Sequence, residues 1–198
     1  MMDGPQVPGR IMFLLPLILS LAILSWAVFI YNRLIAYRNE AERSWAQVDV
    51  QLKLRHDLLP KLVEVVKGAM AFEKDTLTAI AEARGKALAG PGQGLPTAGQ
   101  AQAEAALTPL LGRFFGLWEK YPELKSNRNA MELQQELSMV EERIAYARTH
   151  YNGVVANYNT LLQQLPDAWI ANLAKCKALP YFEASEGDRA DPVLNLAR

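Results

Sequence analysis

The chain has 198 residues, a length that accommodates one domain of ordinary size together with an anchor and a tail. Lys and Arg total 21 and Asp and Glu also total 21, so no net charge attracts nucleic acid or an anionic surface. Cys176 is the only cysteine, which excludes an intrachain disulfide and a two-thiolate metal site, and two histidines are too few for a His-rich metal site.

The first strong pattern is an apolar segment near the N-terminus. Residues 11–32 are 22 consecutive residues without a charged side chain, and they follow a short N-terminal tail, residues 1–10. About 20 helical residues at ~1.5 Å rise per residue span a hydrocarbon core about 30 Å thick. The sequence therefore predicts a transmembrane helix over residues 11–32 and a single-pass membrane protein whose first partner is the lipid bilayer.

Aromatic and basic residues cluster at the C-terminal end of this segment. Trp26, Tyr31 and Tyr37 are of the type that gathers at a membrane–water interface, and Arg33 and Arg38 lie beside them. We therefore expect these five residues to anchor the helix at the interface.

Two other interpretations of the apolar segment stay open, and its orientation follows from a small charge difference. The segment could be a signal peptide cleaved near Ser25-Trp26-Ala27, although it exceeds the ~7–15 apolar residues of a signal-peptide core, or a buried helix of a soluble domain. Arg10 is the one basic residue before it, whereas Arg33, Arg38 and Arg43 follow it. By the positive-inside rule, we expect the following domain in the cytoplasm.

For residues 33–165 the sequence predicts an all-α domain that forms an antiparallel up-and-down helical bundle. No segment shows the period-two alternation of a strand. Between Arg33 and Leu59 there is no Gly or Pro, and apolar residues recur every three or four positions, which predicts a helix continuous with the membrane helix. Pro60 removes an amide donor and disfavours helical geometry at Leu59. It either kinks one long helix, leaving three long helices, or begins a new one, giving four.

The following helices are separated by a loop and a turn. A helix is predicted over residues 61–89, followed by a loop at 90–99 with four glycines and two prolines. A further helix is predicted over 100–121, although Pro109 makes its middle suspect, and residues 121–127 are predicted to form a turn.

The last long helix has the most regular pattern, with apolar residues at alternating steps of three and four, as in a coiled coil. We expect this stripe to pack against helices of the same bundle or against a second copy of the chain. The polar residues Asn152, Asn157 and Asn159 alternate with aromatics there and predict an interhelical hydrogen bond. The candidate helix–helix or oligomer seam consists of Leu137, Val140, Ile144, Tyr151, Val154, Tyr158 and Leu161.

Residues 166–198 are predicted to form a C-terminal tail that is partly disordered. The apolar residues between Trp169 and Phe182 either pack back on the bundle or lie on a membrane surface. Residues 183–198 are acidic, rich in small residues and contain proline, which predicts disorder.

No local motif indicates catalysis, a cofactor or a metal. Neither His56 nor His150 has a glutamate three residues before it, so the Glu-x-x-His motif of di-iron bundles is missing. The sequence also has no Gly-x-x-x-x-Gly-Lys-Ser/Thr loop for a nucleotide phosphate. We therefore expect no catalytic residue, no cofactor-binding residue and no metal ligand.

Polar residues crowd the region around Pro60. Asp49, Arg55, His56, Asp57 and Glu64 could form an unrecognised enzyme site if a pocket brought them together. Such residues more often cap helices or form a paired, partly buried network, which is the interpretation that we prefer.

Several segments match one known family in chain order. They are residues 31–34 (YNRL), 38–39 (RN), 45–53 (WAQVDVQLK), 55–68 (RHDLLPKLVEVVKG), 121–125 (YPELK), 141–148 (EERIAYAR), 151–152 (YN), 158–159 (YN) and 181–182 (YF). This pattern closely resembles the LemA family over nearly the whole chain, except for the glycine-rich loop and the last dozen residues. The resemblance implies a bacterial protein with one N-terminal membrane helix and an antiparallel domain similar to a four-helix bundle. It implies no catalytic residues or cofactors.

Some LemA-like proteins act in forming membrane organelles, and others are encoded beside membrane metalloproteases. By this analogy we expect a membrane-anchored interaction or scaffolding protein of the bacterial cell membrane that forms a homo-oligomer. A second membrane protein, such as a membrane metalloprotease, is a candidate partner, and nucleic acid is not. The alternatives are a self-assembling membrane-remodelling or organelle-forming protein, and an enzyme with a site near residues 49–57.

Overall fold

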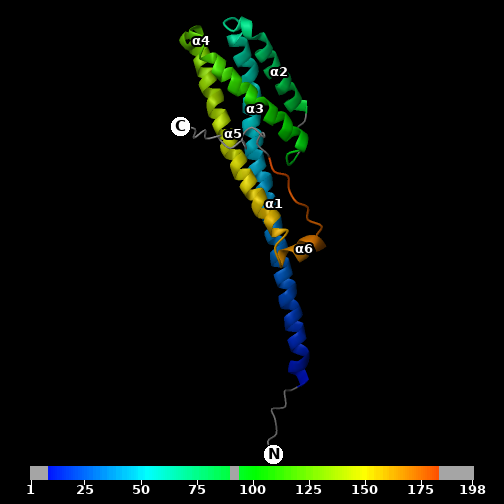
Figure 1. Ribbon diagram of the computed structural model, residues 1–198. Coiled ribbons are helices and arrows are strands. Elements are labelled where there is room, and N and C mark those ends of the chain that lie inside the picture. Colours follow the sequence, from blue (N-terminus) through cyan, green and yellow to red (C-terminus); the bar gives the residue numbers. More distant parts are fainter. Residues whose placement is uncertain (1–8, 90–93, 183–198) are drawn as a thin grey trace, which may run out of the picture. The chain divides into compact units, whose positions relative to one another are not determined.

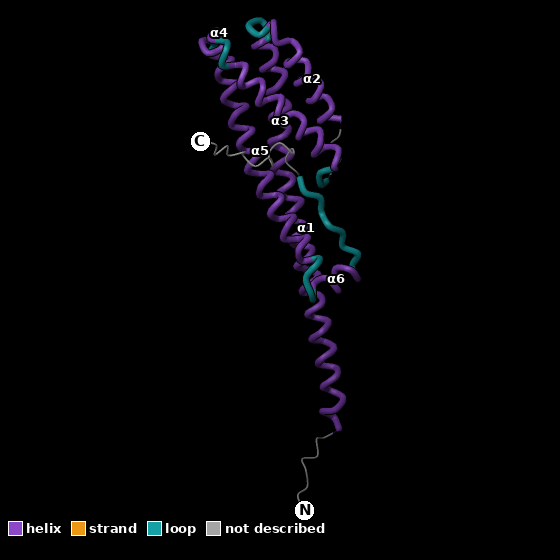
Figure 2. Tube along the Cα trace, in the orientation of Figure 1, coloured by secondary structure: helices purple, strands orange, loops and turns teal. Residues whose placement is uncertain are grey.

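The computed structural model describes residues 9–89 and 94–182, with side chains from Leu14 on, Ala98 excepted. Every regular element in these residues is helical, and no strand occurs among them (Figures 1 and 2). The predicted all-α fold is therefore confirmed, whereas the predicted disorder of residues 183–198 lies outside the described part of the chain. Two compact units are present: residues up to Glu40 with Ala156–Leu179, and Ala41–Val155 with the residues from Pro180 on.

Helix α1 (Gly9–Val66) is a single helix of 58 residues that continues through Pro60. Pro60 lacks the amide that would bond to the carbonyl oxygen of His56, four residues earlier. The side chain of Arg84 donates to this oxygen instead, with Nε at 2.7 Å. The hydrogen bond that proline removes is thereby replaced, so Pro60 does not divide the helix.

The N-terminal part of α1 is the one helix in the described residues that is long and apolar enough to cross a membrane. Its most apolar 18-residue window has a mean hydropathy of 2.3 and is 6% buried. Large apolar side chains such as Leu15 and Ile18 are exposed along it. A helix with this apolar exposed surface fits a membrane anchor.

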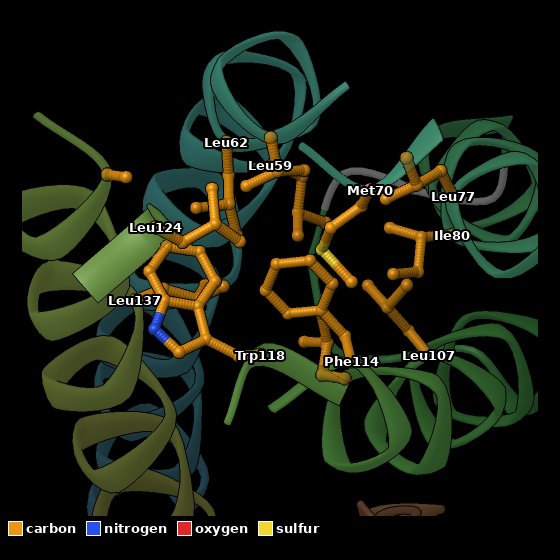
Figure 3. Packing of buried hydrophobic residues seen from close by; sticks show 13 residues of the cluster. Leu59, Leu62, Met70, Leu77, Ile80, Leu107, Phe114, Trp118, Leu124 and Leu137 are labelled. Carbon is orange, nitrogen blue, oxygen red and sulfur yellow. The ribbon is translucent and has the colours of Figure 1, made fainter. Parts of the chain in front are cut away.

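The second unit is an up-and-down bundle. The part of α1 from Ala41 on is followed by α2 (Lys74–Ala89), α3 (Ala98–Trp118) and α5 (Arg128–Leu161), and successive long helices reverse direction (Figure 1). The core contains apolar side chains from all four helices, and Figure 3 shows Trp118 beside Leu124 and Leu137. The rings of Phe114 and Trp118 have centroids 5.8 Å apart. Mutual burial of the four apolar stripes therefore holds this unit together.

The prediction of one helix over residues 61–89 is wrong, because the structure has a break in its N-terminal half, between Val66 and Lys74. The structure continues α1 to Val66, then has a turn, the short 3₁₀ helix η1 (Ala71–Glu73) and α2. Gly68 weakens the helix directly after Val66, and the buried Met70 fixes the turn, with its amide 2.8 Å from the Val66 oxygen. The chain therefore reverses at residues 67–73, although these residues resemble a helix in apolar content.

The next two elements also differ from the predictions. Helix α3 ends at Trp118 and runs through Pro109 without a break. Its N-terminus is capped by the Thr97 side chain, whose oxygen accepts from the Gln100 amide at 3.2 Å. The predicted turn at residues 121–127 contains the short helix α4 (Pro122–Ser126), which begins with proline and buries Leu124.

In the first unit, α6 (Asp167–Leu173) packs on α1. Ile30 and Leu34 of α1 and Ala171 of α6 form a small buried cluster. Arg33 Nη2 lies 2.6 Å from Asp167 Oδ1, and this carboxylate is almost fully buried. The tail predicted from residue 166 on therefore begins with an ordered helix.

The asparagines of α5 bind the C-terminal segment and not a neighbouring helix, which corrects the predicted interhelical hydrogen bond. The Asn152 amide donates to the Phe182 oxygen at 3.0 Å and accepts from the Phe182 amide at 2.9 Å. Asn159 makes the same pair of bonds with Leu179, at 3.0 and 2.9 Å, whereas Asn157 is exposed. Sequence spacing could not distinguish a helix from an extended segment as the partner.

We expect Asn152→Ala to loosen the C-terminal segment and to lower the free energy of unfolding by about 1–3 kcal/mol, the loss of two hydrogen bonds. Hydrogen exchange at the Phe182 amide should become faster, because its acceptor is removed. The exposed Asn157→Ala is the matched control and should leave this exchange unchanged. Equal exchange in both variants would mean that Asn152 does not hold the segment.

Candidate functional site

Four ionisable side chains meet inside the bundle unit. Arg55 and His56 come from α1, Glu104 from α3 and Glu141 from α5. Arg55 is 1% exposed, and its Nη1 lies 3.1 and 3.2 Å from the two carboxylate oxygens of Glu141. Its Nη2 bonds to one oxygen of Glu104, and His56 Nε2 lies 2.8 Å from the other. We call these four residues the buried ion network; it joins three helices.

Opposite charges face one another in the network, where Arg55 binds the carboxylates of Glu104 and Glu141. Burial by itself raises the pKa of Glu104, but the hydrogen bond from His56 and the positive charge of Arg55 outweigh it and hold the pKa below 4.5. The Glu104 carboxylate is therefore ionised at neutral pH and accepts the proton of His56 Nε2, so His56 Nδ1 is left buried without a hydrogen-bond partner in the described residues. A carboxylate held ionised in this way is a poor general acid near neutral pH.

A small pocket of about 230 Å³ adjoins the network and is lined by His56, Glu104, Asp49, Lys53 and Gln100, among others. No group of three or more His, Cys, Asp or Glu side chains with the spacing of a metal site occurs in the described residues. In the lining of this pocket His56 Nε2 and Glu104 bind each other, whereas Asp49 and Lys53 are exposed. The bonds of the network join α1 to α3 and α5 and so oppose a shift in their register.

The structure brings together only part of the polar set singled out in the sequence. Arg55 and His56 are in the network, whereas Asp49, Asp57 and Glu64 are exposed on α1. Glu104 and Glu141, the two acidic partners, were missed. A signal existed for Glu104, because it lies three residues before Leu107 and four after Gln100 on the stripe of α3 that faces the core.

The five residues that the sequence predicts to anchor the helix at a membrane interface all lie on α1. Trp26, Tyr31 and Tyr37 are exposed at 47%, 44% and 36%, and Arg33 binds Asp167. Arg38 also interacts with another residue of the protein. Their predicted anchoring at a membrane interface therefore stays a prediction.

Most of the candidate seam of α5 is buried within the chain. Leu137, Val140, Ile144, Tyr151 and Tyr158 are buried, whereas Leu161 is half-buried. Val154 is also half-buried, and Val155 is fully buried in its place. Tyr151, Val155 and Tyr158 follow one another at steps of four and three, so Val155 lies between the two tyrosines on the buried side of α5.

These features define a helical-bundle protein with one N-terminal helix of membrane-spanning length and a buried ion network in its core. The model of the LemA family matches residues 44–195. The chain therefore belongs to the LemA family.

Curated relatives cover most of the chain. It is 24% identical over 191 residues to Protein LemA of Metamycoplasma hominis, covering 94% of this chain and 84% of that protein. It is also 24% identical over 204 residues to the magnetosome protein MamQ of Magnetospirillum gryphiswaldense, covering 87% of this chain and 74% of MamQ. Magnetosome protein MamQ 2 of Paramagnetospirillum magneticum is 22% identical, covering 84% of this chain and 71% of that protein.

We expect the buried ion network to make stability depend on pH in the acid range. The pKa of Glu104 in the folded protein is below the ordinary 4.5, so its contribution is fully present above pH 4.5 and is lost as the pH falls through the lower folded value. Denaturation curves should show wild type losing stability faster than Glu104→Gln below pH 4.5. Parallel curves for the two proteins would contradict this role of Glu104.

Proposed function

We propose that this protein is a membrane-tethered scaffolding protein of the bacterial cell membrane that acts without catalysis, with its bundle in the cytoplasm. The observation that carries the proposal is the continuity of α1: one helix contains the exposed apolar segment and also contributes core residues such as Leu59 and Leu62 to the bundle. A scaffold needs this covalent link between anchor and interaction domain. Tethering raises the local concentration of the bundles, so weak contacts suffice for assembly.

The buried ion network supports a structural role over a catalytic one. Arg55 and the Nε2 of His56 are engaged by carboxylates, and Asp57 is exposed. Asp49 is also exposed, and it lines the pocket beside His56 and Glu104. An enzyme with a site near residues 49–57 would need convergent polar groups free to meet a substrate. This alternative is therefore the less favoured.

A surface groove between α1 and α5 is the interaction face that we propose for self-association. It has a volume of about 680 Å³ and is lined by apolar and uncharged polar side chains, with Glu142 and Arg143 also in its lining. Val50 and Tyr146, both in the groove, are 56% and 79% exposed. Exposed apolar side chains with charged neighbours are typical of a contact with another protein.

Site-directed crosslinking in intact membranes tests the scaffold. In a Cys176→Ser background, Tyr146→Cys should give crosslinked homo-oligomers, and the added substitution Val50→Asp should weaken them by placing a charge in the groove. Phe72→Cys is the matched control, because Phe72 is 97% exposed on η1 and does not line the groove. Only monomers at residue 146, together with a monomeric mass of the detergent-solubilised wild type, would contradict the proposal.

A second membrane protein, such as a membrane metalloprotease, is a further candidate partner that the family resemblance suggests. Copurification of the full-length chain with such a protease after crosslinking at Tyr146 supports it, provided that Val50→Asp reduces the yield. If Tyr146→Cys recovers the same amount of protease with and without Val50→Asp, the result counts against a specific contact at the groove.

The similarity to MamQ favours one second candidate, a self-assembling membrane-remodelling protein. Such a protein forms large assemblies, whereas the scaffold that we propose forms small oligomers. The mass of the solubilised protein and electron microscopy of membranes that contain it distinguish the two. A large, regular assembly with curved membranes would favour remodelling.

A further inference from the structure

Helix α6 lies on α1 at the point where the uncharged segment ends. Ile30 and Leu34 pack against Ala171, and the cluster also contains Ile170 (Figure 1 shows α6 beside α1). Arg33 is the first charged residue after residues 11–32, and it is the residue that binds Asp167. At ~1.5 Å rise per residue, this ion pair lies within about one helical turn of the end of the uncharged segment.

The other face of α6 is apolar and uncovered. Trp169 and Leu173 lie four residues apart in α6, which places them on one side of the helix, and they are 67% and 81% exposed. Leu165, two residues before α6 begins, is also 67% exposed. Asp167 is the single charged residue of α6, and it is buried against Arg33. The exposed face of α6, with Leu165 before it, therefore presents a tryptophan and two leucines without a charge of its own.

The chemistry of this face matches the boundary between lipid headgroups and acyl chains. Tryptophan prefers this boundary because its ring is apolar and its N–H is polar, and leucine buries its side chain among acyl chains. The exposed Lys175 and Lys177 follow α6 and suit the phosphates of anionic lipids. The exposed apolar residues of α1 extend to Phe29, one residue before the Ile30 that packs in the cluster with Ala171.

We propose that α6 is an interfacial helix that lies in the headgroup layer of the bilayer, with Leu165, Trp169 and Leu173 inserted toward the acyl chains. The contacts of Arg33 with Asp167 and of Leu34 with Ala171 fix α6 to α1, so α6 sets the depth at which α1 leaves the membrane. This inference rests on the proposed function, because it requires α1 to span the bilayer.

Spin-label accessibility of the full-length protein in liposomes that contain anionic lipid tests the inference. Single cysteines are placed at Leu173, at Leu21 in the apolar segment and at Phe72 on the bundle outside the proposed groove, in a Cys176→Ser background. Leu21, Leu173 and Phe72 are all exposed in the structure, so the labels do not disturb a core. Oxygen concentrates in the acyl region, whereas a water-soluble nickel complex reports on aqueous exposure.

The label at Leu173 should lose nickel accessibility to a level near that at Leu21 and gain oxygen accessibility over that at Phe72. Nickel accessibility at Leu173 equal to that at Phe72, with Leu21 protected, would overturn the interfacial helix and leave the membrane anchor intact. Nickel accessibility at Leu21 would overturn the anchor itself. Spin–spin broadening at Leu173 with protection from both reagents would mean that a second copy covers α6, which also overturns the inference.

Discussion

Replacing Arg55 with methionine is expected to lower the free energy of unfolding by about 3–5 kcal/mol, because removing one partner of a buried ion pair leaves an uncompensated charge. The side chains of Arg55 and Glu104 are 1% and 4% exposed, so solvent screens them little. Guanidinium denaturation, followed by the fluorescence of Trp45 and Trp118 inside the bundle unit, measures the loss.

The double variant Arg55→Met with Glu104→Gln distinguishes this cause from a simple loss of packing. Arg55→Met leaves the carboxylates of Glu104 and Glu141 without the guanidinium, and Glu104 is the more deeply buried of the two, at 4% against 22% exposed. Neutralising Glu104 removes that charge, so the double variant should be more stable than Arg55→Met alone. The exposed Lys53→Met, on the same helix, is the control and should change stability by less than about 0.5 kcal/mol. A double variant that is less stable than Arg55→Met would show that charge compensation is not the source of the effect.

The second large effect concerns the proline inside α1. Arg84→Met should destabilise the protein by about 1–3 kcal/mol, because the carbonyl oxygen of His56 loses the side chain that donates to it and has no backbone donor at Pro60. Pro60→Ala restores a backbone N–H at the helical position and removes a residue that costs about 3 kcal/mol in a helix interior. We expect Pro60→Ala to stabilise the protein.

The two substitutions should not be additive, because they act on the same acceptor. In a Pro60→Ala background, Arg84→Met should cost much less than in wild type, since the alanine amide bonds to the His56 oxygen. Thermal and chemical denaturation of the four proteins complete this double-mutant cycle. Equal costs of Arg84→Met in both backgrounds would mean that Arg84 does not replace the missing hydrogen bond.

The predictable part of this protein was the apolar periodicity of its helices. The spacing of Leu137, Val140 and Ile144 identified α5, and the uncharged residues 11–32 identified the exposed apolar part of α1. Both are local patterns, in which the side chains that share a face are neighbours along one helix. The family resemblance drew on the same segments and is confirmed by the match to residues 44–195.

The buried ion network could be predicted only in part. Leu52, Arg55 and Leu59 follow one another at steps of three and four on the side of α1 that faces the core. A charged residue at this position predicts an oppositely charged, buried partner. The identity of that partner depends on which helices face each other. Glu104 is 49 residues away and Glu141 is 86 residues away, and no local pattern relates them to Arg55.

Local sequence rules could not predict that α1 continues through Pro60 or that α6 forms after residue 166, for the same reason. Proline in a helix is tolerated here because Arg84, from another helix, reaches the His56 oxygen. α6 is ordered because Asp167 and Ala171 bind α1 through Arg33, Ile30 and Leu34. Each case depends on a contact between residues far apart in the sequence, and the amino-acid pattern alone does not encode the pairing.

Extraction of cell membranes with alkaline carbonate tests the membrane-anchored account most directly. The full-length protein should stay in the membrane pellet, because α1 has an uncharged, exposed apolar segment of spanning length. A variant with Leu19→Arg and Ile23→Arg should be released, since each charge at the centre of a spanning helix costs about 2.5–3.5 kcal/mol. Release of the wild-type protein into the carbonate supernatant would contradict the account.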